Sequence, residues 1–247
     1  MERGLGGEVV LPRVITIDGP AGVGKTSLAE RLAERLGYHV YDTGALYRAA
    51  TLLAARDGLA AVGRADEARI IRLIEAAHIH VGPPRDAASE PVVTINGEDV
   101  TGDLRSPAVN GLVSAVSQLP GVRGALLAVQ RRAAAAGSVI MVGRDMGTVV
   151  VPDADLKIYL DADPRVRAER RARQLAARGR PRPIGEIVRE EAERDRLDSN
   201  RAVAPLRPAP DAIIIINDAL TPEEVADRAL HEVEKAAARM GAGGEAG

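Results

Sequence analysis

The chain has no cysteine, no phenylalanine and no tryptophan, and only four of its 247 residues are tyrosines. The absence of cysteine excludes disulfides and thiolate metal sites, and it suits the reducing cytoplasm, where we expect the protein to reside. With so few aromatic rings, nucleic-acid bases would find few platforms on which to stack. The core must therefore be built from Ala, Val, Leu and Ile, and we expect no nucleic-acid partner.

The chain also lacks a strong charge of one sign, since its net charge is −2 at pH 7. No global electrostatic field therefore attracts polyanions. No apolar run approaches the roughly 20 residues that a membrane-spanning helix needs, and we expect no membrane partner. Lysine is scarce as well: Lys25, Lys157 and Lys235 are the three lysines among 33 Lys and Arg residues. Because arginine supplies nearly all of the positive charge, the position of each lysine is informative.

Lys25 lies in a glycine-rich loop, residues 19–27, which we call the phosphate loop. Its sequence matches the pattern G-x-x-x-x-G-K-[ST], and it follows the short apolar run 14–17 and precedes leucines at helical spacing. In such a loop, backbone N–H groups and a helix N-terminus bind phosphate, and the lysine reaches the β- and γ-phosphates. The predicted nucleotide-binding residues are Gly19, Pro20, Ala21, Gly22, Val23, Gly24, Lys25, Thr26 and Ser27, with Thr26 as the Mg²⁺ ligand.

Five short apolar runs have the length of buried strands. They alternate with segments of helical spacing, several of which end at a glycine. This alternation predicts a doubly wound parallel sheet in an α/β fold. The five runs are residues 14–17, 39–41, 139–142, 156–160 and 213–216.

Two stretches depart from this alternation. Residues 59–107 combine a helical segment with two strand-like runs, and Asn96-Gly97 predicts a type I′ hairpin, so we expect an inserted piece with antiparallel strands. Residues 165–190 are highly charged and contain a Gly/Pro hinge between two expected helices. We predict one domain over residues 13–240, preceded by a flexible segment, 1–12, and followed by a disordered tail, 241–247.

A phosphate loop alone fits several classes of nucleotide-binding protein. GTPases read guanine with an Asn-Lys-x-Asp element, and no lysine of this chain follows an asparagine. That class is therefore excluded. The remaining classes must account for arginines that follow strand ends or glycine-containing motifs, namely Arg48, Arg123, Arg144, Arg194 and Arg201. Phosphoryl transfer between two nucleotides brings several phosphates into one cleft, and guanidinium groups offset their repulsion.

Three ordered motifs carry a specific resemblance. Residues 42–48 read Asp-Thr-Gly-Ala-Leu-Tyr-Arg, residues 143–150 read Gly-Arg-Asp-Met-Gly-Thr-Val-Val, and residues 194–206 begin Arg-Asp-Arg-Leu-Asp. Together with the phosphate loop, they resemble the bacterial cytidylate kinases, a family of P-loop nucleoside-monophosphate (NMP) kinases, from about residue 13 to residue 240. Val142 departs from the pattern, since many relatives carry Asp there, but we assign that position no catalytic role.

The resemblance implies a five-stranded parallel sheet flanked by helices, with an NMP-binding insert at about 59–107 and a helical lid at about 165–190. It implies transfer of the γ-phosphate of ATP to CMP or dCMP with Mg²⁺, by a monomer. The implied CMP-binding residues are Thr43, Gly44, Arg48, Ser117, Arg123, Arg144, Asp145, Arg194, Asp198 and Arg201. The implied catalytic residues are Lys25, Arg144, Asp145 and Arg201.

Within that set the resemblance assigns roles. Ser117, Arg123 and Asp145, which we call the base-reading trio, contact cytosine. Asp198, with Arg194 nearby, binds the sugar. Arg48, Arg144 and Arg201 grip the acceptor phosphate. One or two arginines of the lid are expected to touch ATP, from the set Arg167, Arg170, Arg171, Arg173 and Arg178.

Three alternatives stay open at this stage. The Ser117 hydroxyl could serve as a helix cap. The whole chain could bind nucleotide without transferring phosphate, or it could phosphorylate a small metabolite on the same fold. The last alternative leaves the base-reading trio without a purpose.

Overall fold

The structure is a computed structural model that describes residues 10–84, 91–177 and 179–243. The predicted flexible segment 1–12 falls largely outside the described residues, as do residues 244–247 of the predicted tail, whereas residues 241–243 continue the last helix. The strands are β1 Val14–Asp18, β2 His39–Asp42, β3 Ile79–Pro84, β4 Pro91–Ile95, β5 Glu98–Asp99, β6 Val139–Val142, β7 Leu156–Asp161 and β8 Ile213–Ile216. The helices are α1 Lys25–Leu36, α2 Thr43–Arg56, α3 Glu67–Ala76, α4 Pro107–Val116, α5 Pro120–Ala135, α6 Pro164–Ala177, α7 Ile184–Ser199 and α8 Pro222–Gly243.

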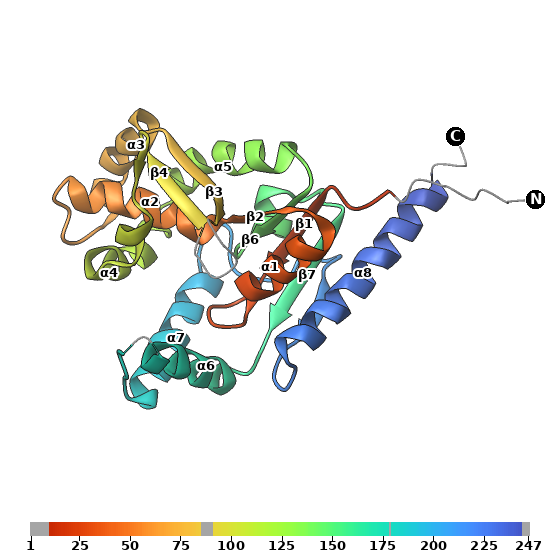
Figure 1. Cartoon of the computed structure of the whole chain (residues 1–247). Helices are drawn as coiled ribbons and strands as arrows, with labels where there is room; N and C mark the ends of the chain where they lie inside the picture. The colour runs from red at the N-terminus through yellow and green to blue at the C-terminus, as the bar shows by residue number, and fades with distance from the viewer. Residues whose placement is uncertain (1–9, 85–90, 178, 244–247) are drawn as a thin grey trace, which may run out of the picture.

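The main sheet has five parallel strands in the order β2-β6-β1-β7-β8 (Figure 1). The predicted strands and the predicted α/β fold are therefore confirmed. Strand β1 lies at the centre, between β6 and β7, and Ile17 is in register with Val142 and Ile158. Because parallel strands end at the same edge, the segments that follow β1, β2 and β6 meet there.

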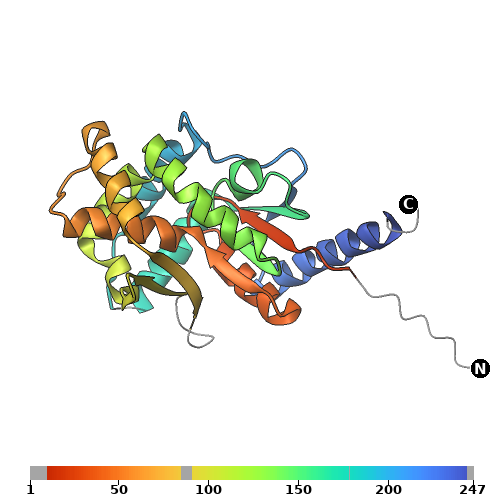
Figure 2. The same cartoon turned by 90° about the horizontal axis from the view of Figure 1, so that it is seen from above.

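Side chains of the central strands alternate between two layers of core, as the period of a strand requires. Ile15 and Ile17 pack with residues of α1 and α8 on one face of the sheet. Val139 and Met141 pack with residues of α2 and α5 on the other face. Figures 1 and 2 show α8 beside α1 on one side of the sheet and α5 on the opposite side.

The inserted piece has the predicted character. Strands β3, β4 and β5 form a separate antiparallel sheet. Asn96 and Gly97 both have positive φ, 53° and 86°, as a type I′ turn demands.

Helix α4, by contrast, was not predicted. Its sequence contains three valines and a glycine, which lower helix propensity. The signal that could have found it is the Ser106-Pro107 pair: Pro107 occupies the first turn, and the Ser106 hydroxyl accepts a hydrogen bond from the Val109 N–H.

Among the described helices, none is by itself both long and apolar enough to cross a membrane; α4 and α5 meet that test only as a pair, bent by 99° between them.

Candidate active site

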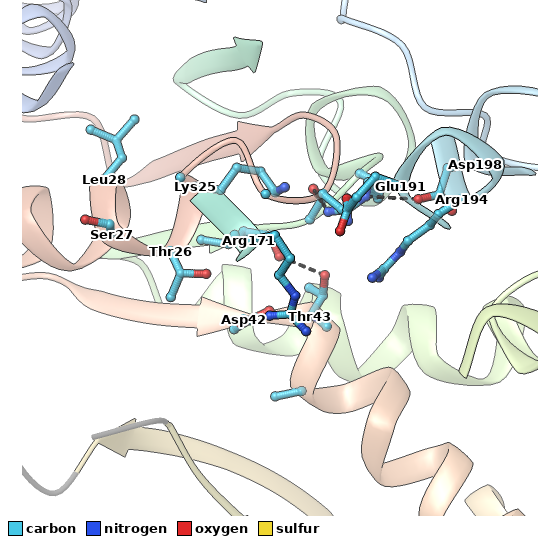
Figure 3. Close-up of a pocket in the computed structure, with 18 of the residues that line it drawn as sticks. Lys25, Thr26, Ser27, Leu28, Asp42, Thr43, Arg171, Glu191, Arg194 and Asp198 are labelled. Carbon is cyan, nitrogen blue, oxygen red and sulfur yellow. Dashed lines mark hydrogen bonds and ion pairs between the residues drawn. The ribbon is translucent and has the colours of Figure 1, made fainter. Parts of the chain in front are cut away.

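A cavity of about 970 Å³ opens at the carboxyl edge of the main sheet, and residues of the insert, α6 and α7 complete its wall. Sixteen of the predicted site residues line it, and Figure 3 shows several of them around one space. They are Ala21, Gly22, Gly24, Lys25, Thr26, Ser27, Thr43, Gly44, Arg48, Ser117, Arg123, Arg144, Asp145, Arg194, Asp198 and Arg201. Three predicted residues, Gly19, Pro20 and Val23, do not line the cavity and instead shape the phosphate loop from behind.

The conformation of the phosphate loop depends on its glycines. Gly19 has φ 147°, and a Cβ there would lie 2.0 Å from the carbonyl oxygen of Leu160, so no other residue fits. Gly24 also has positive φ and directly precedes α1, whose N-terminus faces the cavity. The Lys25 ammonium donates to the Pro20 carbonyl at 2.6 Å across the loop. The buried side chain of Val23 packs into the core, which anchors the loop to the sheet.

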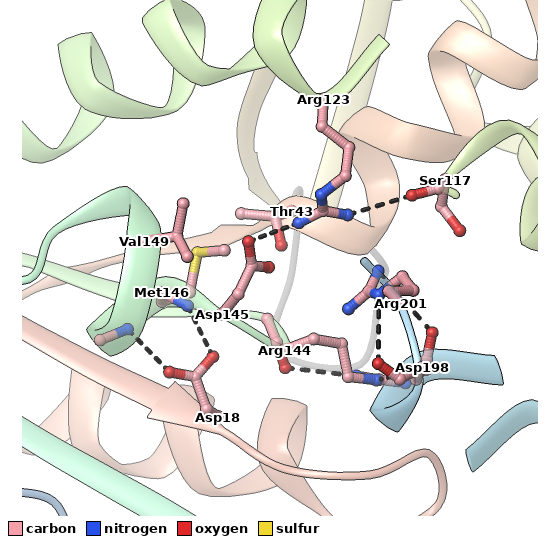
Figure 4. Close-up of polar contacts among 12 residues, drawn as sticks. Asp18, Thr43, Ser117, Arg123, Arg144, Asp145, Met146, Val149, Asp198 and Arg201 are labelled. Carbon is pink, nitrogen blue, oxygen red and sulfur yellow. Dashed lines mark hydrogen bonds and ion pairs between the residues drawn. The ribbon is translucent and has the colours of Figure 1, made fainter. Parts of the chain in front are cut away.

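The base-reading trio converges on Arg123, as Figure 4 shows. The Arg123 guanidinium forms a buried ion pair with the Asp145 carboxylate and donates to the Ser117 carbonyl at 3.1 Å. Its charged end lies 5.3 Å from the centre of the Tyr47 ring, within cation–π range. The Ser117 hydroxyl donates to the Ser114 carbonyl, in the capping position of α4 that the sequence left open. The three residues therefore form one hydrogen-bonded unit, held by α2, α4, α5 and the segment after β6.

A second polar group is centred on Asp198, near the end of α7. Its carboxylate accepts from the Arg144 side chain at 3.1 Å and lies 3.8 Å from an Arg201 nitrogen. Arg201 also donates to the Asp198 carbonyl at 3.2 Å, and its Nη2 is buried without a hydrogen-bond partner among the residues that the structure describes. A buried guanidinium N–H without an acceptor destabilises the folded protein unless a ligand supplies that acceptor. We infer that an anion of the substrate does so.

Arg48 belongs to α2 and is held by one residue of the insert and one of α4. One of its terminal nitrogens donates to the Leu104 carbonyl at 3.0 Å and to the Asn110 amide oxygen at 2.7 Å. Thr43 and Gly44 start the same helix: the Thr43 hydroxyl donates to the Val142 carbonyl at 2.8 Å, and the Gly44 N–H donates to the Asp42 carboxylate. These contacts join β2, β6 and the insert at the cavity.

The cavity concentrates positive charge that the described protein groups do not fully offset. Burial, reinforced by Arg144 and Arg194, lowers the pKa of the Lys25 ammonium well below its usual range. Burial, reinforced by Arg144, lowers the pKa of Arg194, and burial with Arg123 lowers that of Arg201. Burial and neighbouring arginines also lower the pKa of Arg48, to about 10. Buried cations that repel one another are stabilised when negative charges bind among them. The cavity is therefore suited to bind several negative charges.

The lid arginines divide into two groups. Arg170, Arg171 and Arg173 of α6 line the cavity. Arg167 instead lies buried behind the phosphate loop, where it donates to the Ala21 carbonyl at 3.1 Å and pairs with Asp195. Arg178 lies outside the described residues.

Sequence reasoning missed two residues that shape this site. The buried Asp18 carboxylate accepts from the N–H groups of Met146 and Gly147. The Asn217 amide donates to the Val23 carbonyl at 2.9 Å. A charged or amide residue directly after an apolar strand was the available signal for Asp18 and Asn217.

Mg²⁺ prefers a few oxygen ligands together with substrate phosphates rather than an all-protein cage. The Thr26 hydroxyl and the carboxylates of Asp42 and Glu30 line the same cavity. Over the described part of the chain, no group of three or more His, Cys, Asp or Glu residues is placed to hold a metal on its own. The donor set thus fits Mg²⁺ that arrives with a nucleotide.

The comparisons with known proteins agree with the motifs. The family model of cytidylate kinase matches residues 15–235. The cytidylate kinase of Pelotomaculum thermopropionicum (strain DSM 13744 / JCM 10971 / SI) is 48% identical over 211 residues, which cover 85% of this chain and 91% of that protein. The cytidylate kinase of Solibacter usitatus (strain Ellin6076) is 45% identical over 219 residues, which cover 88% and 90% respectively.

A solved structure of an uncharacterized protein from Eubacterium ventriosum ATCC 27560 shares the fold, with a TM-score of 0.50 at 11% identity over 90% of this chain and 98% of that one. The family itself is shown by the sequence matches: the family model spans residues 15–235, and the two relatives named above are matched over 90% and 91% of their own length. On these grounds the chain belongs to the cytidylate kinase family.

Proposed function

We propose that the protein transfers the γ-phosphate of ATP to CMP and dCMP, giving ADP and CDP or dCDP. The observation that carries the proposal is the position of Arg123, which is held between Asp145 and Ser117 in the same cavity as the phosphate loop. A site for a pyrimidine base and a site for a nucleoside triphosphate then share one space, as direct transfer requires.

The base-reading trio favours cytosine for a chemical reason. Cytosine carries an exocyclic amino group where uracil carries a carbonyl, so the Asp145 carboxylate accepts from cytosine and repels uracil. Arg123 donates to the ring nitrogen and carbonyl of cytosine, whereas uracil would direct an N–H at that donor. The mismatch leaves buried polar groups unpaired, which is the kind of difference on which strong selectivity rests.

The phosphates are held by positively charged side chains that repel one another in the free protein. Arg48, Arg144 and Arg201 grip the acceptor phosphate, and Lys25 with the loop N–H groups grips the donor phosphates. Asp198 and Arg194 contact the sugar. The acceptor phosphate is already a competent nucleophile near neutral pH, so no general base is needed. Positioning and electrostatic stabilisation of the transition state carry the catalysis.

Mg²⁺, held by Thr26 and the donor phosphates, would supply additional neutralisation of phosphate charge. Helices α6 and α7 pack against each other at the lid that we place at about 165–190, and α6 carries Arg170, Arg171 and Arg173 into the cavity. Their closure over ATP would exclude water, the competing acceptor of the γ-phosphate.

We further propose that residues 13–240 form one kinase domain with the NMP-binding insert at about 59–107. We also propose that the protein acts as a monomer in the cytoplasm on small-molecule substrates, with neither nucleic-acid nor membrane partners. Size-exclusion chromatography with light scattering tests the oligomeric state.

A coupled assay of ADP release tests the reaction with CMP, dCMP, UMP and AMP as acceptors, each over a range of concentrations. We expect the highest kcat/KM with CMP or dCMP and low values with AMP. Turnover of AMP equal to or above that of CMP would overturn the assignment. ATP binding with no CMP-dependent ADP release would support a binding module instead.

A further inference from the structure

Asp18 is the last residue of β1 and directly precedes the phosphate loop. Its side chain is buried, with 5% of the residue exposed. One carboxylate oxygen accepts from the Met146 N–H at 2.9 Å, as Figure 4 shows, and the other accepts from the Gly147 N–H at 2.8 Å. Met146 follows Asp145 directly in the chain. A single side chain thus links the start of the phosphate loop to a member of the base-reading trio.

The segment that Asp18 holds has an uncommon conformation. Residues Met146–Val150 form a single π-helical turn, in which the Asp145 carbonyl accepts from the N–H groups of Val149 and Val150. The first N–H groups of such a turn have no partner within it. The Asp18 carboxylate accepts from two of them, the N–H groups of Met146 and Gly147.

The turn also packs against the sheet without room to shift. A Cβ on Gly147 would lie 2.9 Å from the Thr16 hydroxyl and 3.1 Å from a carbon of the Lys157 side chain. Met146 is fully buried. The position of Asp145 therefore depends on how the turn is docked on β1, and the bonds to Asp18 are the polar part of that docking.

The charge state of Asp18 depends on the groups around it. Burial raises its pKa to about 6, against the opposing effect of the two N–H bonds. The charged groups that face it are Asp145, which also raises the pKa, and Lys25 of α1, which lowers it; Tyr159 of β7 interacts with it as well. A protonated carboxyl group offers one acceptor fewer, so one of the two N–H groups would then lose its partner.

We infer that Asp18 is a positioning residue for base recognition: its ionised carboxylate orients the 146–150 turn so that Asp145 faces Arg123 and the cytosine. The inference rests on the proposed function, because it names a determinant of specificity for the same reaction. Asp18 itself is not among the residues that line the cavity.

The test is the ratio of kcat/KM for CMP to kcat/KM for UMP, measured between about pH 5 and pH 8. The acceptor phosphates of the two substrates titrate alike, so their titration cancels in the ratio. For the unaltered protein we expect the ratio to fall as the pH is lowered through about 6. For Asp18→Asn, which is nearly the same size, we expect a ratio about tenfold lower at pH 8 that varies little with pH.

Asp155→Asn is the matched control. The Asp155 carboxylate accepts from the Val14 N–H at 2.9 Å, at the opposite end of the same strand and away from the cavity. We expect its ratio to equal that of the unaltered protein. ATP binding in the absence of a monophosphate, measured by calorimetry, should be the same for Asp18→Asn and the unaltered protein. This measurement distinguishes a misplaced Asp145 from a disrupted fold or phosphate loop.

The outcomes are distinct. An Asp18→Asn variant that keeps the full ratio, or that loses rate equally with both substrates, would overturn the inference. The pH profile of the unaltered protein needs no substitution, and a ratio that is constant through pH 6 would also overturn it. An unaltered protein without any preference for CMP over UMP would overturn this inference alone, whereas turnover of AMP equal to or above that of CMP would remove the proposed function as well.

Discussion

The Arg167 guanidinium lies 2.6 Å from the Asp195 carboxylate and joins three parts of the molecule. Arg167 belongs to α6 and Asp195 to α7, while the same guanidinium donates to the Ala21 carbonyl of the phosphate loop at 3.1 Å. The side chain of Arg167 is buried. Through these two contacts, Arg167 connects α6 and α7 to the loop that we propose binds the donor phosphates.

Arg167→Met should weaken ATP binding. It removes a buried ion pair and the bond to Ala21, so we expect the free energy of unfolding to fall by about 3 kcal/mol and the KM for ATP to rise by at least tenfold. Urea unfolding and steady-state kinetics measure the two effects. Arg165→Ala is the control, since Arg165 lies on the same helix with its side chain 84% exposed, and it should change neither quantity. An unchanged KM for ATP in the Arg167 variant would contradict this expectation.

Asp145→Ala should reduce both rate and selectivity. Without the carboxylate, the cytosine amino group loses its acceptor and Arg123 loses its partner. Because a bond to a charged group contributes about 1.5–3 kcal/mol, we expect the preference for CMP over UMP to fall by about ten- to a hundredfold. Steady-state kinetics with both substrates measure it. A variant that loses only ATP affinity would show that Asp145 has been assigned to the wrong substrate.

Lys25→Met should abolish most turnover yet stabilise the free protein. Removal of the positive charge that stabilises the transferred phosphate should lower kcat by about 10²–10³-fold. The free energy of unfolding should increase, because burial lowers the pKa of Lys25 and the folded state therefore disfavours its charged form. The unfavourable term is fully present below the folded-state pKa and disappears as the pH rises from that value toward 10.5.

Thermal unfolding of this variant at pH 7 should therefore give a higher midpoint than for the unaltered protein. Binding of CMP, measured by calorimetry, should be largely retained. A lower midpoint, or loss of CMP binding, would contradict the account of Lys25 as a buried cation that serves the donor phosphates.

Gly19→Ala should disrupt the phosphate loop. The added Cβ would lie 2.0 Å from the Leu160 carbonyl oxygen at a φ of 147°, so the loop must move or the protein must unfold. We expect nucleotide binding to be lost. Gly111→Ala is the contrasting control, because nothing lies within 4 Å of its added Cβ on α4. That variant should gain about 0.5–1 kcal/mol of stability and keep its activity, as urea unfolding and the coupled assay would show.

Local chemistry explains why much of this molecule could be predicted. The five central strands are short apolar runs, and Thr221 with Glu224 forms a capping box at the start of α8, which the local sequence pattern specifies. Helix α4 could not be predicted from its composition, because its valines favour strands. It is stabilised instead by packing: Val109, Val113 and Val116 are buried in the core that α2 and α5 share.

The candidate site was predictable as a set of residues but not as a set of contacts. The motifs specify Asp145 and Asp198 by type and spacing, and the family resemblance adds Arg123. Nothing local indicates that Arg123 pairs with Asp145, 22 positions away, while Arg144 turns to Asp198, 54 positions away. These pairings depend on the strand order, which brings distant segments to one edge of the sheet.

What the sequence by itself determined is therefore the local part: the glycine conformations of the phosphate loop, the strands, most of the helices, and the residue types that a phosphate-binding site needs. The tertiary structure alone decided which arginines face the cavity and which, like Arg167, support it from behind. It also gave Asp18 its partners, 128 and 129 positions along the chain. The physical reason is that backbone preferences act between neighbours in the chain, whereas burial and charge pairing act between neighbours in space.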